Sequence, residues 1–199
     1  MSPRTEETNQ RIREEQRQHI LHAARKLFAH RGLIATKMTD IANAADVSYG
    51  LAYHYFKNKE EIFTTLVERA LDGTVSIMEQ ARSMPGTPLD RITWLGSQML
   101  EGLKDQPDYT MLVLQTFTSE AVPQRLRERA LEQSMAFLDT LRQLIVEGQE
   151  AGQIVAGNPD YLASAFSACM QGLAVGHTFY GSVYPVYPDL NTIMHLLKP

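Results

Sequence analysis

The chain has 199 residues, 44% hydrophobic and 21% charged, which is the composition of an ordinary globular protein with room for one or two modest domains. Its one cysteine excludes an internal disulfide framework and a cysteine-rich zinc site, and is typical of the reducing cytosol. No basic region followed by an apolar core marks a signal peptide at the N-terminus. The most apolar stretch, residues 161–180, contains two serines, a glutamine and a histidine, so we interpret it as a buried helix rather than a membrane span. We expect a cytoplasmic protein without membrane contact.

The net charge of −4 is unevenly distributed along the chain. Residues 1–60 hold ten Lys/Arg and seven Asp/Glu, or +3, whereas residues 61–199 hold nine and sixteen, or −7. A basic N-terminal segment suits an anionic partner such as nucleic acid, while the acidic remainder would stay away from it. Chance asymmetry is the alternative, so the charge is supporting evidence only.

The N-terminal third of the chain predicts short helices separated by turns. Residues 1–15 are polar and are predicted to form a flexible arm. An amphipathic helix follows over about 15–30 and ends at Gly32. A short helix is expected over Met38–Ala45, and the next over Tyr49–Phe56.

Capping residues predict where the third and fourth helices begin. Ser48 stands before Tyr49 as an N-cap. Asn58 caps the fourth helix, with Glu61 three residues on in capping-box position, and that helix continues towards Ser83.

Beyond a break at residues 84–88, prolines in first-turn positions mark the remaining helix starts. The sequence contains no repeat and almost no segment with strand character. It predicts an all-α protein of about nine helices, the later ones over about 88–104, 107–119, 122–152, 158–180 and 189–197.

The order of these N-terminal elements predicts a helix-turn-helix whose last helix is rich in tyrosine. Residues from about Arg17 to Leu66 also resemble the DNA-binding domain of the TetR-like (tetracycline-repressor-type) transcriptional regulators. The residues that carry the resemblance are Ile20, Ala24, Leu27, Phe28 and Gly32; Ala35 and Thr36; Asp40, Ile41, Ala42 and Ala45; Val47, Ser48 and Gly50; and Tyr53, Tyr55, Phe56, Lys57, Lys59, Glu60, Glu61 and Phe63. The ordered set covers about a quarter of the chain and is specific, whereas the rest matches only in being helical.

The resemblance implies a three-helix DNA-binding domain over residues 16–62 and a helical ligand-binding and dimerisation domain over 63–199. It places Thr39, Tyr49, Gly50, Leu51 and His54 at groove-facing positions, and Lys37, Tyr53 and Lys59 at phosphate-contact positions. Thr36 joins Lys37 at the start of the second helix, where backbone N–H groups also suit a phosphate.

The predicted reading helix departs from the common pattern of base recognition. Asn43 apart, no Arg, Asn or Gln lies between Met38 and Lys57, so the usual bidentate base readers are missing. Sequence choice would then depend on tyrosines, on contact of Leu51 with thymine methyls and on DNA shape. The arginines of the N-terminal arm would add minor-groove contacts or belong to a solvated tail, the interpretation that we favour. Tyr55 is interpreted as a core residue. His54 could equally contact DNA or be an ordinary exposed histidine.

A dimer is predicted from the C-terminal helices. Small residues form a ridge on one helix face at Ala165, Cys169, Gly172 and Gly176. The last helix has an apolar stripe at Leu190, Ile193, Met194 and Leu197. We expect these two helices of each subunit to form a four-helix dimer interface, the alternative being packing within one chain. The dimer would recognise a palindromic operator through two half-sites related by its two-fold axis.

A binding site for a small apolar or amphipathic effector is expected among the middle helices. Each candidate is an aromatic, Met or sparse polar residue that could equally belong to the core. The candidates are Trp94, Gln98, Met99, Tyr109, Leu112, Met135, Phe137, Phe166, Met170, His177 and Tyr180.

The function predicted from the sequence is therefore a ligand-responsive repressor that a small molecule releases from double-stranded DNA. A ligand-independent regulator and an activator are the alternatives. No metal spacing, phosphate loop or nucleophile motif indicates an enzyme, and no cofactor or metal is expected. A redox switch at Cys169 is disfavoured because a lone cysteine on a packing face is usually inert.

Overall fold

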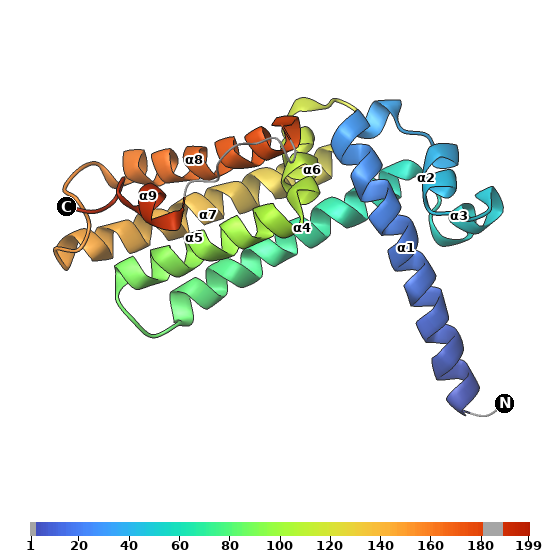
Figure 1. Ribbon diagram of the computed structural model, residues 1–199, viewed down its shortest axis with the longest axis horizontal. Helices are drawn as coiled ribbons and strands as arrows, with labels where there is room; N and C mark the ends of the chain where they lie inside the picture. The colour runs from blue at the N-terminus through green and yellow to red at the C-terminus, as the bar shows by residue number, and fades with distance from the viewer. Residues whose placement is uncertain (1–2, 181–188) are drawn as a thin grey trace.

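The computed structural model describes residues 3–180 and 189–199, and their regular structure is entirely helical (Figure 1). The all-α prediction is confirmed. In chain order the helices of these residues are α1 (Pro3–Ala35), α2 (Met38–Ala44), α3 (Tyr49–Tyr55), α4 (Lys59–Ser83), α5 (Pro88–Asp105), α6 (Pro107–Thr118), α7 (Gln124–Glu150), α8 (Pro159–Tyr180) and α9 (Leu190–Met194).

Side-chain caps start several helices at the predicted residues. The Ser48 hydroxyl accepts the N–H of Leu51 at 3.2 Å, and the Asn58 carboxamide accepts that of Glu61 at 2.8 Å. Thr87 caps α5 reciprocally with Asp90. Backbone N–H groups at a helix start have no partner inside the helix, so these local bonds fix where α3, α4 and α5 begin.

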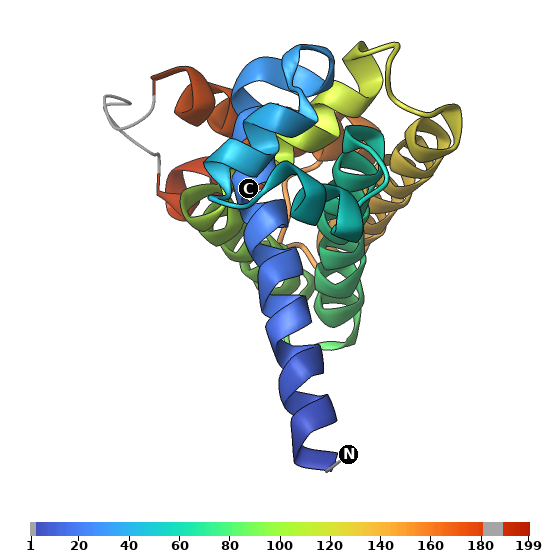
Figure 2. The same ribbon diagram turned by 90° about the vertical axis from the view of Figure 1, so that its right-hand side faces the viewer.

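The N-terminal arm differs from the prediction because residues 3–15 are helical and continue α1. Good helix formers fill this segment, and polar neighbours pair along it, with Arg11 and Glu15 at 3.6 Å and Arg17 and Glu14 at 3.9 Å. The start of α1 projects away from the rest of the molecule (Figures 1 and 2). The sequence prediction gave too little weight to a long run without a helix breaker.

Two clusters of buried side chains form the interior. The first gathers α1, α2, α3 and the start of α4 with parts of α6 and α7, and includes Phe28, Phe56 and Phe63 at no more than 1% exposure. The second lies between the end of α4 and α5, α7, α8 and α9, around Leu95 and Phe166.

Helix α4 runs without a break through both clusters. Its residues Phe63, Val67 and Leu71 belong to the first, and Ala81 belongs to the second. The domain boundary expected after residue 62 therefore falls inside α4, and the first cluster continues past it to Leu71.

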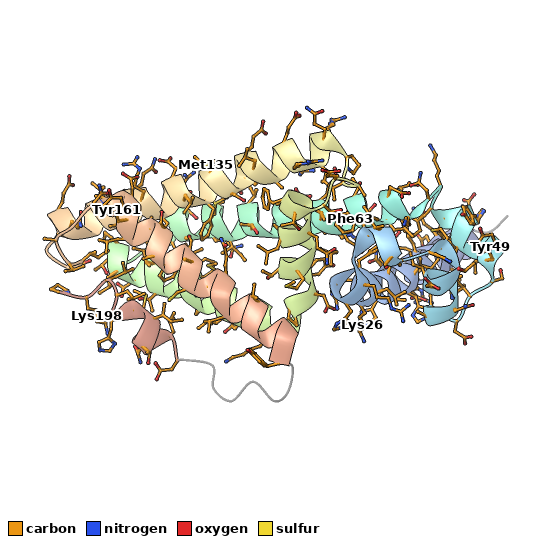
Figure 3. The ribbon with its side chains drawn as sticks, turned by 90° about the horizontal axis from the view of Figure 1, so that it is seen from above. Lys26, Tyr49, Phe63, Met135, Tyr161 and Lys198 are labelled. Atoms are coloured by element: carbon orange, nitrogen blue, oxygen red, sulfur yellow. The ribbon has the colours of Figure 1, made fainter. Side chains whose placement is uncertain are left out.

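The molecule is long, with α2 and α3 at one end and the α7–α8 connection towards the other (Figure 1). In the view from above, Tyr49 lies at the end opposite Tyr161 and Lys198 (Figure 3). Among the described helices, none has the length and apolarity needed to cross a membrane. The same residues contain no cluster of three His, Cys, Asp or Glu side chains suited to a metal ion.

Gly32 interrupts α1 with φ 75° and ψ 169°, a backbone conformation that is essentially restricted to glycine. Gly32→Ala should therefore lower the free energy of unfolding by about 1–3 kcal/mol. Gly73→Ala is the control, because Gly73 lies inside α4 with nothing within 4 Å of an added Cβ, and should raise it by up to about 1 kcal/mol. Denaturant unfolding measures both, and equal stability of Gly32→Ala and the wild type would contradict the strained turn.

Candidate nucleic-acid interface

Small and apolar side chains hold α2 and α3 together at the end of the molecule. Ala42, Ala45 and Ala52 are 2% exposed or less, which lets the two helices approach closely. The turn between them closes with a 3.0 Å bond from the Val47 N–H to the Ala42 carbonyl, and Asp46 takes a positive φ of 50°. The packing fixes the angle between the helices and leaves the outer face of α3 uncovered.

That outer face presents two tyrosines at the tip of the molecule. Tyr49 and Tyr53 are 51% and 42% exposed, and their rings pack edge to face with centroids 4.7 Å apart. The two hydroxyl groups lie 3.2 Å apart and share a hydrogen bond. This hydrogen bond raises the pKa of Tyr53 above its ordinary value of 10.0. A tyrosine is protonated at neutral pH even without such a shift, so the phenol can donate to an oxygen.

Most of the predicted DNA-contacting residues share this accessible surface. Gly50 and His54 are exposed on α3, and Leu51 is half-buried. Lys37 and Thr39 are exposed at the start of α2. The His54 ring packs against Tyr55, which is half-buried against the first core cluster as the sequence indicated.

Lys59 has another role in the structure than the one expected. Its Nζ donates to the carbonyl oxygens of Leu33, Ile34 and Thr36 at 2.7, 3.0 and 2.9 Å. An ammonium group has three protons, so none is left for a phosphate in this arrangement. The contact satisfies carbonyls that the end of α1 leaves without partners.

Thr36 also differs from its expected role. Its side chain is fully buried, and the hydroxyl donates to the Gly32 carbonyl at 2.8 Å. Because the residue as a whole is 0% exposed, its backbone N–H, the group expected to face a phosphate, is covered as well. The role of Lys59 could not be read from the sequence, because it depends on how the start of α4 meets the end of α1, more than twenty residues earlier in the chain. The bond of Thr36 is local, four residues long, but the burial of Thr36 depends on the tertiary packing.

The Arg17 side chain connects α1 to the end of α3. Its guanidinium lies 5.1 Å from the centroid of the Phe56 ring, which follows α3 directly. Arg17 thus helps to fix α3 relative to the long first helix.

The predicted dimer residues fall into two groups. Ala165, Cys169 and Gly172 lie exposed on one face of α8, and Gly176 is half-buried. Ile193 and Leu197 are instead 4% and 0% exposed, packed in the second core cluster. The expectation that they line an interface is corrected, because the short α9 turns its apolar side inward against α5 and not towards solvent.

The predicted effector residues are likewise divided. Trp94, Met99 and Phe137 pack half-buried against the second core cluster, to which the buried Phe166 and Met170 belong. Leu112 is buried in the first cluster, while Met135 and Tyr180 are exposed. Gln98 is bonded to Glu101 on its own helix, and the side chain of His177 lies outside the described residues.

Of these candidates, Tyr109 borders a pocket of about 290 Å³ between α1, α4 and α6. Arg25 lies over its ring, 4.9 Å from the centroid, and also bonds Asp108 and Gln106. Burial, followed by the charges of Arg25 and Lys26, lowers the pKa of His22 in the same pocket. The predicted candidates do not converge on one site.

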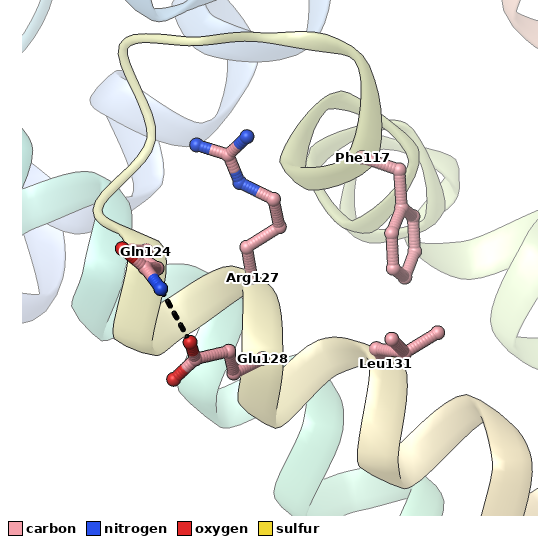
Figure 4. A pocket seen from close by; sticks show the side chains of 5 residues that line it. All are labelled: Phe117, Gln124, Arg127, Glu128 and Leu131. Carbon is pink, nitrogen blue, oxygen red and sulfur yellow. Dashed lines mark hydrogen bonds between the residues drawn. The ribbon is translucent and has the colours of Figure 1, made fainter.

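A larger pocket, of about 430 Å³, opens between the end of α6 and the start of α7 (Figure 4). Phe117, Gln124, Arg127, Glu128 and Leu131 line it. None of these was selected from the sequence. Phe117 and Leu131 look like any other helical apolar residues until their exposure is known.

Comparison with known proteins agrees with the helix-turn-helix geometry. Residues 20–66 match the family model described as bacterial regulatory proteins, tetR family. The transcriptional repressor KstR2 of Mycobacterium tuberculosis is 29% identical over 135 residues, covering 66% of this chain and 68% of that protein.

Solved structures share the complete fold. The MbdR regulator from Azoarcus sp. CIB aligns with a TM-score of 0.79 at 22% identity, over 92% of this chain and 97% of that one. AibR, solved in complex with isovaleryl coenzyme A and operator DNA, aligns with a TM-score of 0.65 at 17% identity, over 86% and 100%.

The contacts of Lys59 predict a stability effect. Lys59→Met should lower the free energy of unfolding by about 1–3 kcal/mol, because three carbonyls at the end of α1 lose a charged donor. Lys57→Met, at an exposed position two residues earlier, should leave it nearly unchanged. Thermal unfolding of both variants makes the comparison, and equal stability would argue against the cap.

Proposed function

This chain belongs to the tetR family of bacterial regulatory proteins, and from that premise we propose that it is a repressor released from its operator by a small molecule. It is a DNA-binding transcriptional regulator and not an enzyme. The observation that carries the proposal is the exposed face of α3, held rigidly at the tip of the molecule with Tyr49 and Tyr53 outward.

In the proposed complex α3 enters the major groove. Tyr49, Gly50, Leu51 and His54 of α3 then face base edges, together with Thr39 of α2. Lys37 and Tyr53 meet phosphates on either side of the groove. Lys59 contributes indirectly, because it fixes the end of α1 behind α2.

The proposed active form is a homodimer, so that two α3 helices read the halves of a palindromic operator. The exposed Ala165, Cys169 and Gly172 of α8 allow close helix contact. The neighbouring helix α7 adds the exposed Met135. We therefore replace α9 by α7 as the second helix of the proposed interface.

An effector is proposed because AibR, which has the same fold, was solved with both isovaleryl coenzyme A and operator DNA. One conformation of the dimer fits the operator and another does not. An effector with higher affinity for the second conformation would shift the population away from the operator-bound form. A small apolar or amphipathic molecule is the class that we propose for this chain.

A ligand-independent regulator is the second candidate. The observation in its favour is that Phe166 and Met170, expected to line an effector site, are 0% and 1% exposed inside a packed cluster. The two candidates differ in whether any small molecule releases the protein from DNA.

The first experiment is fluorescence anisotropy of the purified protein on DNA flanking its gene, against a scrambled duplex and across salt concentrations. Tight, sequence-preferring binding is expected. Equal weak binding to both duplexes, or no binding at low salt, would contradict the proposal.

Two substitutions separate backbone contacts from base reading in the same assay. Lys37→Ala should weaken binding to both duplexes and reduce the slope of log affinity against log salt by about one unit. Tyr49→Ala should change the preference for the operator more than the general affinity. Lys198→Ala, at the opposite end of the molecule (Figure 3), is the control and should change neither. An unchanged slope for Lys37→Ala would remove it from the phosphate contacts.

Gly172→Leu tests the dimer face. A Cβ at Gly172 meets nothing within 4 Å, so the variant should fold as a monomer while its side chain separates the two α8 helices. Gly102→Leu, at an equally open glycine of α5, is the control and should remain dimeric. Sedimentation velocity measures both, and a dimeric Gly172→Leu would exclude this face.

A further inference from the structure

The pocket between α6 and α7 combines an exposed apolar side with a basic group. Phe117 and Leu131 are 40% and 56% exposed and lie together on one side of the pocket (Figure 4). Arg127 lies on the other side, beneath the segment that joins the two helices. Apolar surface left in contact with water is stabilised when a hydrocarbon group covers it.

The half-buried Arg127 is only partly satisfied by hydrogen bonds within the chain. Its Nε is buried without a hydrogen-bond partner, and Nη2 makes a 3.0 Å bond to the Val122 carbonyl. In the described part of the chain no carboxylate lies within 4.0 Å of it. By contrast, Arg129 on the same helix pairs with both Glu68 and Asp72.

The polar rim of the pocket limits the charge that it can accept. Glu128 also lines the pocket, and its carboxylate accepts a 2.7 Å bond from the Gln124 carboxamide. One cation without an anionic partner stands beside one carboxylate that is already hydrogen-bonded. A ligand with a single negative charge therefore fits better than one with several.

We propose that this pocket binds an amphipathic monocarboxylate. The carboxylate accepts hydrogen bonds from the Arg127 guanidinium, and the hydrocarbon part packs on Phe117 and Leu131. The volume of about 430 Å³ is in the range of small-molecule sites. This inference rests on the proposed function, since it gives the effector a site and a chemical class.

The position of the pocket connects it to the DNA-binding end. Two residues before Phe117, the Gln115 carboxamide donates to the Phe28 carbonyl at 2.8 Å and more weakly to that of Ala29. A ligand that shifts the last turn of α6 therefore pulls on α1. Helix α1 contacts the end of α3 through Arg17 and Phe56.

Isothermal titration calorimetry of the full chain with octanoate tests the site directly, with 1-octanol as the neutral probe of equal length. Octanoate should bind saturably, and 1-octanol at least about tenfold more weakly, because a hydrogen bond between charged groups is lost. Arg127→Met should weaken octanoate binding by about tenfold or more. Arg125→Met, exposed on the same helix and outside the pocket, is the matched control and should bind as the wild type.

Leu131→Asp provides a second variant if Arg127→Met fails to fold, because Leu131 is exposed and its replacement leaves the core intact. It should also weaken octanoate binding by about tenfold or more, through repulsion of the carboxylate and loss of apolar contact. Absence of saturable octanoate binding, or wild-type affinity in the folded variants, would overturn the proposed site. Calorimetry contains no DNA, so such a failure leaves the operator-binding proposal to its own assay.

Gln115→Leu separates binding from response. The variant should bind octanoate as the wild type, while the concentration of octanoate needed to release operator DNA should rise by about tenfold, since the link to α1 is lost. Unchanged release would remove Gln115 from the connection.

Discussion

The placement of the DNA-reading helices depends on how the end of α1 is satisfied. A helix leaves its last carbonyl oxygens without partners, and here Gly32 also breaks the helix before Ala35. Lys59, at the start of α4, donates to the carbonyls of Leu33 and Ile34 and to that of Thr36 just after the helix. Gln115 of α6 donates to two carbonyls one turn earlier. The carbonyls at the end of α1 thus become the point where α1, α4 and α6 meet. Because α2 follows only two residues after α1, the same contacts determine where α2 and α3 lie.

Helix α4 extends this constraint to the whole molecule. It contributes Phe63 and Val67 to the core beside α1 and α3, and Ala81 to the core beside α5 and α8. A helix with aligned hydrogen bonds is stiff, so a change in packing at one end changes the position of the other. The ion pairs of Arg129 with Glu68 and Asp72 attach the middle of α4 to α7. The DNA-binding end of the molecule and the opposite end are therefore mechanically connected through α4, although each end has its own core cluster.

Local signals in the sequence predicted most of the helices, except the helical residues 3–15 at the start of α1, and were insufficient for the contacts between helices. Ser48 and Asn58 cap α3 and α4 as predicted, because a cap involves only residues three positions apart. The exposed face of α3 followed from the small residues opposite it. The role of Lys59 could not be predicted, since its partners lie more than twenty residues away. The apolar stripe with Ile193 and Leu197 was correctly recognised as one that becomes buried, but the sequence could not show against which surface. It packs inside its own chain and not against a second subunit.

The effector site shows most clearly why residue type alone is a poor guide to a pocket. Aromatic and methionine side chains serve a filled core and a binding site equally well, and Phe166 and Met170 belong to the first case. A binding site is distinguished by apolar side chains that stay exposed and by polar atoms that find no partner within the chain. Phe117 and Leu131 remain exposed, and beside them Arg127 has a buried Nε without a partner. Arg129, two residues later, finds two carboxylates and therefore has a structural explanation. The difference between these arginines depends on tertiary structure, and it is what makes the α6–α7 pocket a better candidate than the aromatic core.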